Sequence, residues 1–282
     1  PYHNKLDEIL KELKKEFKTV VLWDAHSIRR NVKTIQSNPF PDLILGNNFK
    51  KTALILEKDM PEGLSKNYAN DSLSQINLEK AKPNYSIVSE ENGIENNKDK
   101  ENTWIIDPID GTFNFVRQLP HFCVSIACLY KGKLEHGIII DPIKNEEFVT
   151  SRGKGCQLNG QRVRVSSKQE LDGALIGMGG ATLDAEKQSQ LYAKLRTEKS
   201  NIREQGSACL DMAYVACGRL DGLWMYNLKP WDMAAGALMI IESGGLIGDF
   251  NGGPEFMKNG NIVAGNPRCF KALTSIVKRQ YH

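Results

Sequence analysis

Residues 105–115 read IIDPIDGTFNF, an apolar run that leads directly into two aspartates three positions apart. No basic residue within this stretch offsets Asp107 and Asp110, although like charges so close repel one another, above all when they are partly buried. Pro108 restrains the backbone between them, and Gly111 permits a tight turn and a close approach to a ligand. We therefore expect a positive charge from outside the stretch to neutralise the two carboxylates.

The same stretch offers oxygen ligands for a cation beside donors for an anion. Strand 103–107 should be buried, so we expect Asp107 at a sheet edge, where layered α/β proteins bind ligands. Gly111 and Thr112 are expected to open a helical turn whose free N–H groups can hold an anion. Mg²⁺ suits such a place because it takes carboxylates, water and phosphate oxygens. Taken alone, however, a D-x-x-D-G pattern is more often a strand end followed by a turn.

Two further acidic segments strengthen the metal hypothesis. SIVSEENG, at residues 86–93, ends an apolar strand with Glu90 and Glu91. KPWDMAAG, at residues 229–236, places Asp232 at the start of a helix, where a single acid is usually structural. Three acidic segments, each at the mouth of a buried element, favour a shared cation site.

Apolar periodicity and turn residues predict a mixed α/β protein built in layers. A hairpin is expected at 121–142 around the turn KGK, with further short strands over 146–166. The other expected elements are helices at 3–17, 25–36, 70–81, 184–199, 207–220 and 230–245, and strands at 85–89, 103–107, 171–179 and 222–226.

Composition is that of an ordinary globular protein. Of the 282 residues, 40% are hydrophobic and 25% are charged, and the formal net charge of +3 is weak evidence for a nucleic-acid partner. No apolar run approaches the roughly 20 residues of a membrane span, so we expect no membrane partner. Residues 1–17 are charged throughout and lack the apolar segment of a secretory signal, which predicts a cytoplasmic location.

The six cysteines are scattered along the chain and mostly sit in apolar stretches. None forms a CxxC pair, and no group of cysteines and histidines has the spacing of a zinc site. We interpret them as buried, reduced thiols without a chemical role.

Three segments together resemble the successive motifs of inositol-monophosphatase-like phosphatases, in particular the bacterial branch. They are SEENG (89–93), WIIDPIDGTFNFV (104–116) and PWDMAAGALMIIESGG (230–245), and the resemblance extends over about residues 80–270. It implies a magnesium-dependent, lithium-sensitive phosphatase that forms a homodimer. The implied fold is a layered αβαβα sandwich, also found in fructose-1,6-bisphosphatase. The whole chain would form one such unit, with an N-terminal α+β lobe over about 1–168 that carries most metal ligands and a C-terminal α/β lobe over about 169–282.

The resemblance also implies the ligands of two or three Mg²⁺ ions. Glu90 and Asp107, helped by the carbonyl of Ile109, match the ligands of the first ion. Asp107, Asp110 and Asp232 match the ligands of the second. Glu90 thus counts among the catalytic residues.

Further matches concern the substrate, a small phosphorylated alcohol. The backbone amides of Gly111 and Thr112 match those that hold the phosphate. The hydroxyl of Thr112 matches the catalytic group that orients the attacking water. Gly206, Ser207 and Ala208 match the strip that contacts the alcohol portion.

The sequence departs from the family pattern at two places. Counting back from Glu90 without gaps, Ser65 and Asn67 stand where a threonine and an aspartate help to activate the water, and asparagine cannot accept the proton. Asn67→Asp should therefore raise turnover. Met225 stands where a glutamate commonly binds a substrate hydroxyl, which should relax recognition of the alcohol. The first 60 residues match poorly, and Lys58 is only a candidate for the usual loop lysine.

Two functional interpretations remain open at this point. In the first, the protein hydrolyses a small phosphate monoester, inositol-1-phosphate or a similar polyol phosphate, with a metal-activated water. In the second, it is a catalytically weak relative that binds RNA-polymerase-associated factors in transcription antitermination, as bacterial relatives do.

Overall fold

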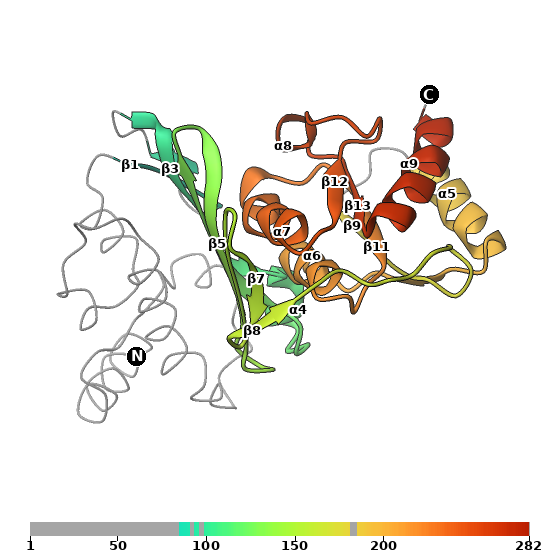
Figure 1. Ribbon diagram of the computed structural model, residues 1–282, viewed down its shortest axis with the longest axis horizontal. Coiled ribbons are helices and arrows are strands. Elements are labelled where there is room, and N and C mark those ends of the chain that lie inside the picture. The colour runs from blue at the N-terminus through green and yellow to red at the C-terminus, as the bar shows by residue number, and fades with distance from the viewer. Residues whose placement is uncertain (1–84, 91–92, 96–98, 181–184, 282) are drawn as a thin grey trace. The chain divides into compact units, whose positions relative to one another are not determined.

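The computed structural model describes residues 85–90, 93–95, 99–180 and 185–281. The chain divides into two compact units, Pro1–Tyr85 and Ser86–His282. The elements described below, drawn in colour in Figure 1, belong to the second unit apart from Tyr85. The helices predicted at 3–17, 25–36 and 70–81 lie outside the described residues, as do Lys58, Ser65 and Asn67. The division into lobes at about residue 168 stays a prediction.

The first sheet has eight strands, and its strands from β3 onward form a meander in which each pairs antiparallel with the next. The predicted hairpin is confirmed: Lys131 and Gly132 both have positive φ, of 51° and 71°, as the tight turn of a two-residue loop requires. The spatial order is β2-β1-β3-β4-β5-β6-β7-β8. The strands are β1 (Tyr85–Ser89), β2 (Gly93–Glu95), β3 (Asp99–Asp110), β4 (Cys123–Tyr130), β5 (Lys133–Asp141), β6 (Glu146–Ser151), β7 (Gly155–Leu158) and β8 (Gln161–Val163).

Strand β3 differs from the expectation in a way that matters for the site. We expected it to end at Asp107, but it continues to Asp110, which pairs with Cys123 of β4. The register shifts between Asp107 and Asp110, so the strand is irregular where Pro108 has no N–H to donate to a ladder. Both aspartates are therefore held within the sheet, not on a loop that follows it.

The second sheet has five strands in the order β10-β9-β11-β13-β12. Strand β9 pairs parallel with both β10 and β11, and β13 pairs antiparallel with β11 and β12. Its strands are β9 (Leu175–Gly180), β10 (Asn201–Arg203), β11 (Gly222–Tyr226), β12 (Leu246–Gly248) and β13 (Ile262–Gly265). The helices of the described residues are α4 (Thr112–Val116), α5 (Ala185–Thr197), α6 (Ala208–Ala216), α7 (Pro230–Glu242), α8 (Phe256–Asn259) and α9 (Pro267–Tyr281).

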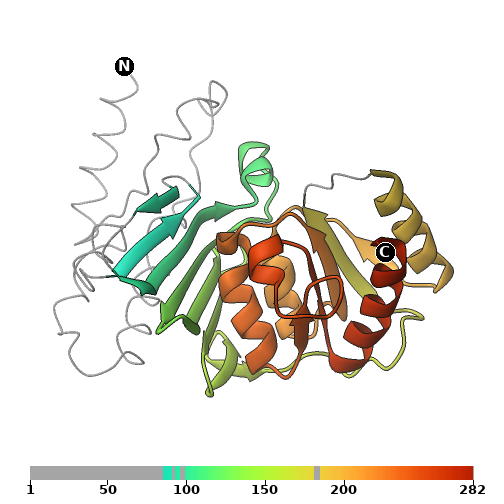
Figure 2. The ribbon, with the colours of Figure 1, turned by 90° about the horizontal axis from the view of Figure 1, so that it is seen from above.

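Helices α6 and α7 lie between the two sheets (Figure 2). Helix α7 packs against β4 and β5, and α6 against β11, so residues on every side of both helices are buried. Gly236 lets the two helices approach, since a Cβ there would lie 2.5 Å from Cβ of Met212. Helices α5 and α9 contact each other, and α9 covers β11 and β13. The order of layers is thus sheet, helices, sheet, helices, and the prediction of an α/β sandwich is confirmed.

Over the residues that the structure describes, no helix is both long enough and apolar enough to cross a membrane.

Candidate metal and phosphate site

Three carboxylates from two distant segments meet where β3 reaches the start of α7. One oxygen each from Asp107, Asp110 and Asp232 lies within 4.8 Å of the other two. Asp107 is 1% exposed and Asp110 8%, whereas Asp232 is only partly buried. Because α7 packs against β3, its first turn brings Asp232 to the irregular end of that strand.

The electrostatics of this group are unfavourable without a cation. Burial, followed by the charges of Asp110, Glu90 and Asp232, raises the pKa of Asp107 well above its ordinary value, although the Ile109 N–H donates to Asp107 Oδ1 at 3.0 Å. Burial likewise raises the pKa of Asp232 to about 7, against the bond of 2.7 Å that the Lys229 N–H donates to its Oδ2. Glu90 follows β1 directly and is close enough to repel both carboxylates.

Asp110 is held by the N-terminal end of α6. Its Oδ2 accepts hydrogen bonds from the Ser207 hydroxyl at 2.5 Å and from the Cys209 N–H at 2.8 Å. Burial raises the pKa of Asp110 and outweighs these bonds, which lower it. The carboxylate is thus fixed in position but still lacks a full counter-charge.

The donor set fits a hard divalent cation. Among the described residues no ion pair reaches Asp107, Asp110 or Asp232, and the three supply only oxygen atoms. Mg²⁺ prefers such ligands, and its charge would remove the repulsion that raises their pKa values. Glu90 lies close enough to Asp107 to raise its pKa, and Ile109, whose N–H donates to Asp107, accepts a hydrogen bond from Thr112 at its carbonyl.

Without divalent cations, the protein is expected to lose stability as the pH rises from about 4 to about 7. In this window folded Asp232 keeps a proton that the unfolded chain, with an ordinary pKa of 3.8, has lost. The folded state then binds more protons, so the free energy of unfolding falls as pH rises. Melting temperatures in a chelator would measure this, and Asp232→Asn should flatten the slope. If the melting temperature of Asp232→Asn changes with pH as steeply as that of the wild type, Asp232 is not the group that holds the proton.

The turn after Asp110 has the expected conformation. Gly111 has φ of +89° and precedes α4, which begins at Thr112 as predicted. A Cβ on Gly111 would lie 3.1 Å from the carbonyl oxygen of His121 and 3.2 Å from that of Gly206, so any other residue there would be both strained and crowded. The Thr112 hydroxyl donates to the Ile109 carbonyl at 2.9 Å. Since a carbonyl oxygen has two lone pairs, this bond leaves Ile109 able to bind a cation.

The segment 206–208 lies beside this turn. Ser207 caps α6: its hydroxyl accepts from the Leu210 N–H at 3.4 Å while it donates to Asp110. A Cβ on Gly206 would lie 3.0 Å from Nδ2 of Asn114 in α4. The fold therefore brings Gly206, Ser207 and Ala208 to the carboxylates, while their contact with a substrate stays a prediction.

Met225 is a core residue. It is 1% exposed and belongs to the apolar core between the sheets, where its side chain faces Gly179. The structure thus gives this position a packing role, and relaxed recognition of the alcohol stays a prediction.

Three polar residues outside the predicted site hold the site together. Asn114 donates from Nδ2 to the carbonyls of His121 at 2.8 Å and Gln205 at 2.7 Å, and so ties α4 to the segment before α6. Gln205 in turn donates from Nε2 to Oδ1 of buried Asp211 at 2.5 Å. Asn114 stands within the quoted motif, which could have marked it. The pairing of Gln205 with Asp211 carries no signal in the sequence.

Asn114→Ala is expected to lower kcat/KM about 10- to 100-fold, the usual range for groups that orient ligands without touching them. Two carbonyl oxygens would lose their donor, at a cost of about 1–3 kcal/mol each if no water replaces it. Steady-state kinetics with chemical denaturation would measure both effects. Asn259→Ala, which removes only an exposed bond to the Asn261 N–H, is the control and should change neither. Equal behaviour of the two variants would refute the role of Asn114.

The chain matches known proteins over the region that carries this site. A family model described as "Inositol monophosphatase family" matches residues 61–281. A second model, described as "N-formylglutamate amidohydrolase", matches residues 1–67, which lie outside the described residues.

Among curated proteins, the chain is similar to "Nus factor SuhB" of Pseudomonas aeruginosa, with 48% identity over 208 residues that cover 71% of this chain and 77% of the relative. The "Nus factor SuhB" of Escherichia coli K12 is 46% identical over 199 residues, covering 70% and 74%.

Solved structures also match the chain. "Extragenic suppressor protein suhB" from Bartonella henselae matches with a TM-score of 0.69 and 40% identity, covering 72% of this chain and 79% of that one. An inositol monophosphatase from Anabaena matches with a TM-score of 0.66 and 36% identity, covering 72% and 81%. The family model covers all three carboxylate segments, and a curated relative and a solved structure match about 70% of the chain at 40% identity or more, so the chain belongs to the inositol monophosphatase family.

Proposed function

We propose that the protein is a Mg²⁺-dependent phosphatase that hydrolyses a small phosphate monoester, inositol-1-phosphate or a similar polyol phosphate. The convergence of Asp107, Asp110 and Asp232 carries this proposal. Two buried carboxylates and a third that is partly buried, whose charges oppose one another, need a cation, and the turn at Gly111 and Thr112 offers N–H groups beside it. Membership of the inositol monophosphatase family supports the same reaction class.

The chain's own groups position the reaction. The N–H groups of Ile109 and Lys229 orient the carboxylates of Asp107 and Asp232. Ser207 and Cys209 do the same for Asp110. These oxygens, with Glu90 and the Ile109 carbonyl, would hold two or three Mg²⁺ ions.

When bound, Mg²⁺ lowers the pKa of a coordinated water and neutralises charge on the phosphoryl oxygens. The amides of Gly111 and Thr112 would donate to those same oxygens. The Thr112 hydroxyl, whose proton already points to the Ile109 carbonyl, would accept a hydrogen bond from the attacking water through an oxygen lone pair.

A substrate panel at fixed Mg²⁺ tests this function. We expect phosphate release from inositol-1-phosphate or another small monophosphate with Mg²⁺, none after chelation, and inhibition by Li⁺. Release that continues unchanged in a chelator would defeat the proposal. Sedimentation of the same sample would test the homodimer that family membership favours.

A second candidate function rests on the name of the relatives. "Nus factor" names a transcription factor, so we also propose that this chain binds a transcription complex. A pull-down with purified RNA polymerase and antitermination factors should then recover wild type and Asp110→Asn equally. Failure to recover either form, or recovery that depends on Asp110, would count against a binding role separate from the metal site.

A further inference from the structure

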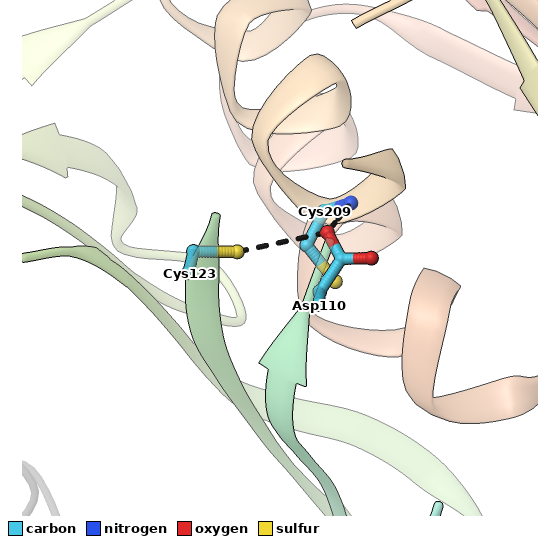
Figure 3. Close-up of side chains that lie close together, drawn as sticks. All are labelled: Asp110, Cys123 and Cys209. Carbon is cyan, nitrogen blue, oxygen red and sulfur yellow. Dashed lines mark hydrogen bonds between the residues drawn. The ribbon is translucent and has the colours of Figure 1, made fainter. Parts of the chain in front are cut away.

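Asp110 belongs to two groups of metal-ligating side chains. The first is the carboxylate group described above. The second joins Asp110 with Cys123 and Cys209, whose ligand atoms also lie within 4.8 Å of one another. Cys123 is the first residue of β4, and Cys209 lies in the first turn of α6. Figure 3 shows both side chains next to one oxygen of the Asp110 carboxylate, while the other oxygen points away from them.

The two thiols are directed at oxygen atoms of the site. Cys123 Sγ donates to Asp110 Oδ2 at 3.7 Å and lies 3.8 Å from the Ser207 hydroxyl. Cys209 Sγ donates to the backbone carbonyl of Asp232 at 3.3 Å. Both cysteines are 0% exposed. Burial raises the pKa of Cys123 to about 12, so without a cation the thiol stays protonated.

This geometry suits a tetrahedral soft cation. Zinc binds sulfur at about 2.3 Å and carboxylate oxygen at about 2.0–2.2 Å, which puts neighbouring ligand atoms of a tetrahedron about 3.5–3.8 Å apart. The 3.7 Å between Cys123 Sγ and Asp110 Oδ2 falls in that range. The Ser207 hydroxyl and the Asp232 carbonyl are each within reach as a fourth ligand.

The charges around the group favour a cation as well. Asp107 and Asp232 lie close to Asp110, and Glu90 is close to both of them. Two thiolates and one carboxylate are the ligands that thiophilic metals select, whereas oxygen-only sites select Mg²⁺. Asp110 therefore belongs to two candidate sites, one that favours thiophilic metals and one that favours Mg²⁺.

We propose that Asp110, Cys123 and Cys209 bind one thiophilic divalent cation, of the class of Zn²⁺ or Cd²⁺, in competition with Mg²⁺ for Asp110. On binding, two metal–sulfur bonds form, the two thiol protons pass to solvent, and no electron is transferred. The thiol site takes Asp110 Oδ2, so a Mg²⁺ ion on the same carboxylate would lie close to a second dication and be repelled, and the two ions oppose each other's binding. The site makes the protein sensitive to soft metals.

Titration of Cd²⁺ into the metal-free full chain tests the site directly. Thiolate-to-cadmium charge transfer should give an ultraviolet absorption that saturates at about one ion per chain. Cys123→Ala and Cys209→Ala should each abolish it. Cys217→Ala is the matched control, because Cys217 and Cys156 are another pair of thiols close enough to interact, and it should keep the signal. No absorption in the wild type, or full absorption in both site variants, would overturn the proposal.

Competition keeps the proposal falsifiable even if a cysteine variant fails to fold. In the wild type, saturating Mg²⁺ should raise the half-saturating Cd²⁺ concentration at least about tenfold, because two divalent cations on one carboxylate repel each other. A Cd²⁺ affinity that does not depend on Mg²⁺ would refute the competition at Asp110. Neither measurement requires turnover. If the thiol site fails these tests, the proposed hydrolysis is unaffected, and the tests can be made even on a protein without phosphatase activity.

Discussion

Asp107→Asn is expected to lower phosphate release at saturating Mg²⁺ by at least about 10²-fold, since even residues that only support a metal ligand cost 10- to 100-fold. The same substitution should raise the melting temperature of the metal-free protein. Asp107 is 1% exposed, and burial together with three neighbouring carboxylates raises its pKa, so its charge destabilises the fold when no cation is present. Phosphate-release kinetics and thermal melts in a chelator measure the two effects.

Asp249→Asn is the matched control for this prediction. Asp249 is also buried, 7% exposed, but its Oδ1 accepts from the N–H groups of Asn251 and Gly253 in a loop outside the carboxylate group. It should leave phosphate release unchanged and lower the melting temperature, because it weakens those bonds. If Asp107→Asn lowers both stability and activity as a folding defect would, Asp107 is a structural residue and the metal assignment is wrong.

Gly111→Ala is expected to destabilise the protein by about 2–4 kcal/mol and to lower kcat/KM by about 10²-fold. Two effects add. A side chain is strained at φ of +89°, and the new Cβ would press on the carbonyl oxygens of His121 and Gly206 at 3.1 and 3.2 Å. Relief requires a shift of the turn that follows Asp110, and with it of the Gly111 and Thr112 amides. Denaturant unfolding and steady-state kinetics measure the two losses.

Gly132→Ala separates the strain of the dihedral angle from the crowding. Gly132 has φ of +71° in the hairpin turn, and a Cβ there would meet no heavy atom within 4 Å. We expect it to cost only about 1–2 kcal/mol and to leave kcat/KM unchanged. A Gly111→Ala variant that loses no more stability and no more activity than Gly132→Ala would show that the turn is not closely packed.

Much of the fold could be predicted because turn and cap residues mark the ends of its helices and strands. The hairpin of β4 and β5 has its Lys-Gly turn residues, and α7 has Pro230 at its first turn and Gly244 after its last. Strands β10 and β12, of three residues each, are too short to show a period, and they were not predicted, nor were α8, β13 and α9. The extension of β3 through Pro108 was also missed, because its partner is β4 and a proline argues against a strand.

The amino-acid sequence by itself determined that carboxylates stand at the ends of buried elements beside a glycine turn, because each motif is made of neighbouring residues and can be recognised from them alone. Only the tertiary structure decided which side chains meet. It seats Asp110 on the first turn of α6, ties α4 to residue 205 through Asn114, and places two cysteines 86 positions apart beside one aspartate. Those contacts follow from how α6 and α7 pack between the two sheets, and no local pattern encodes that packing.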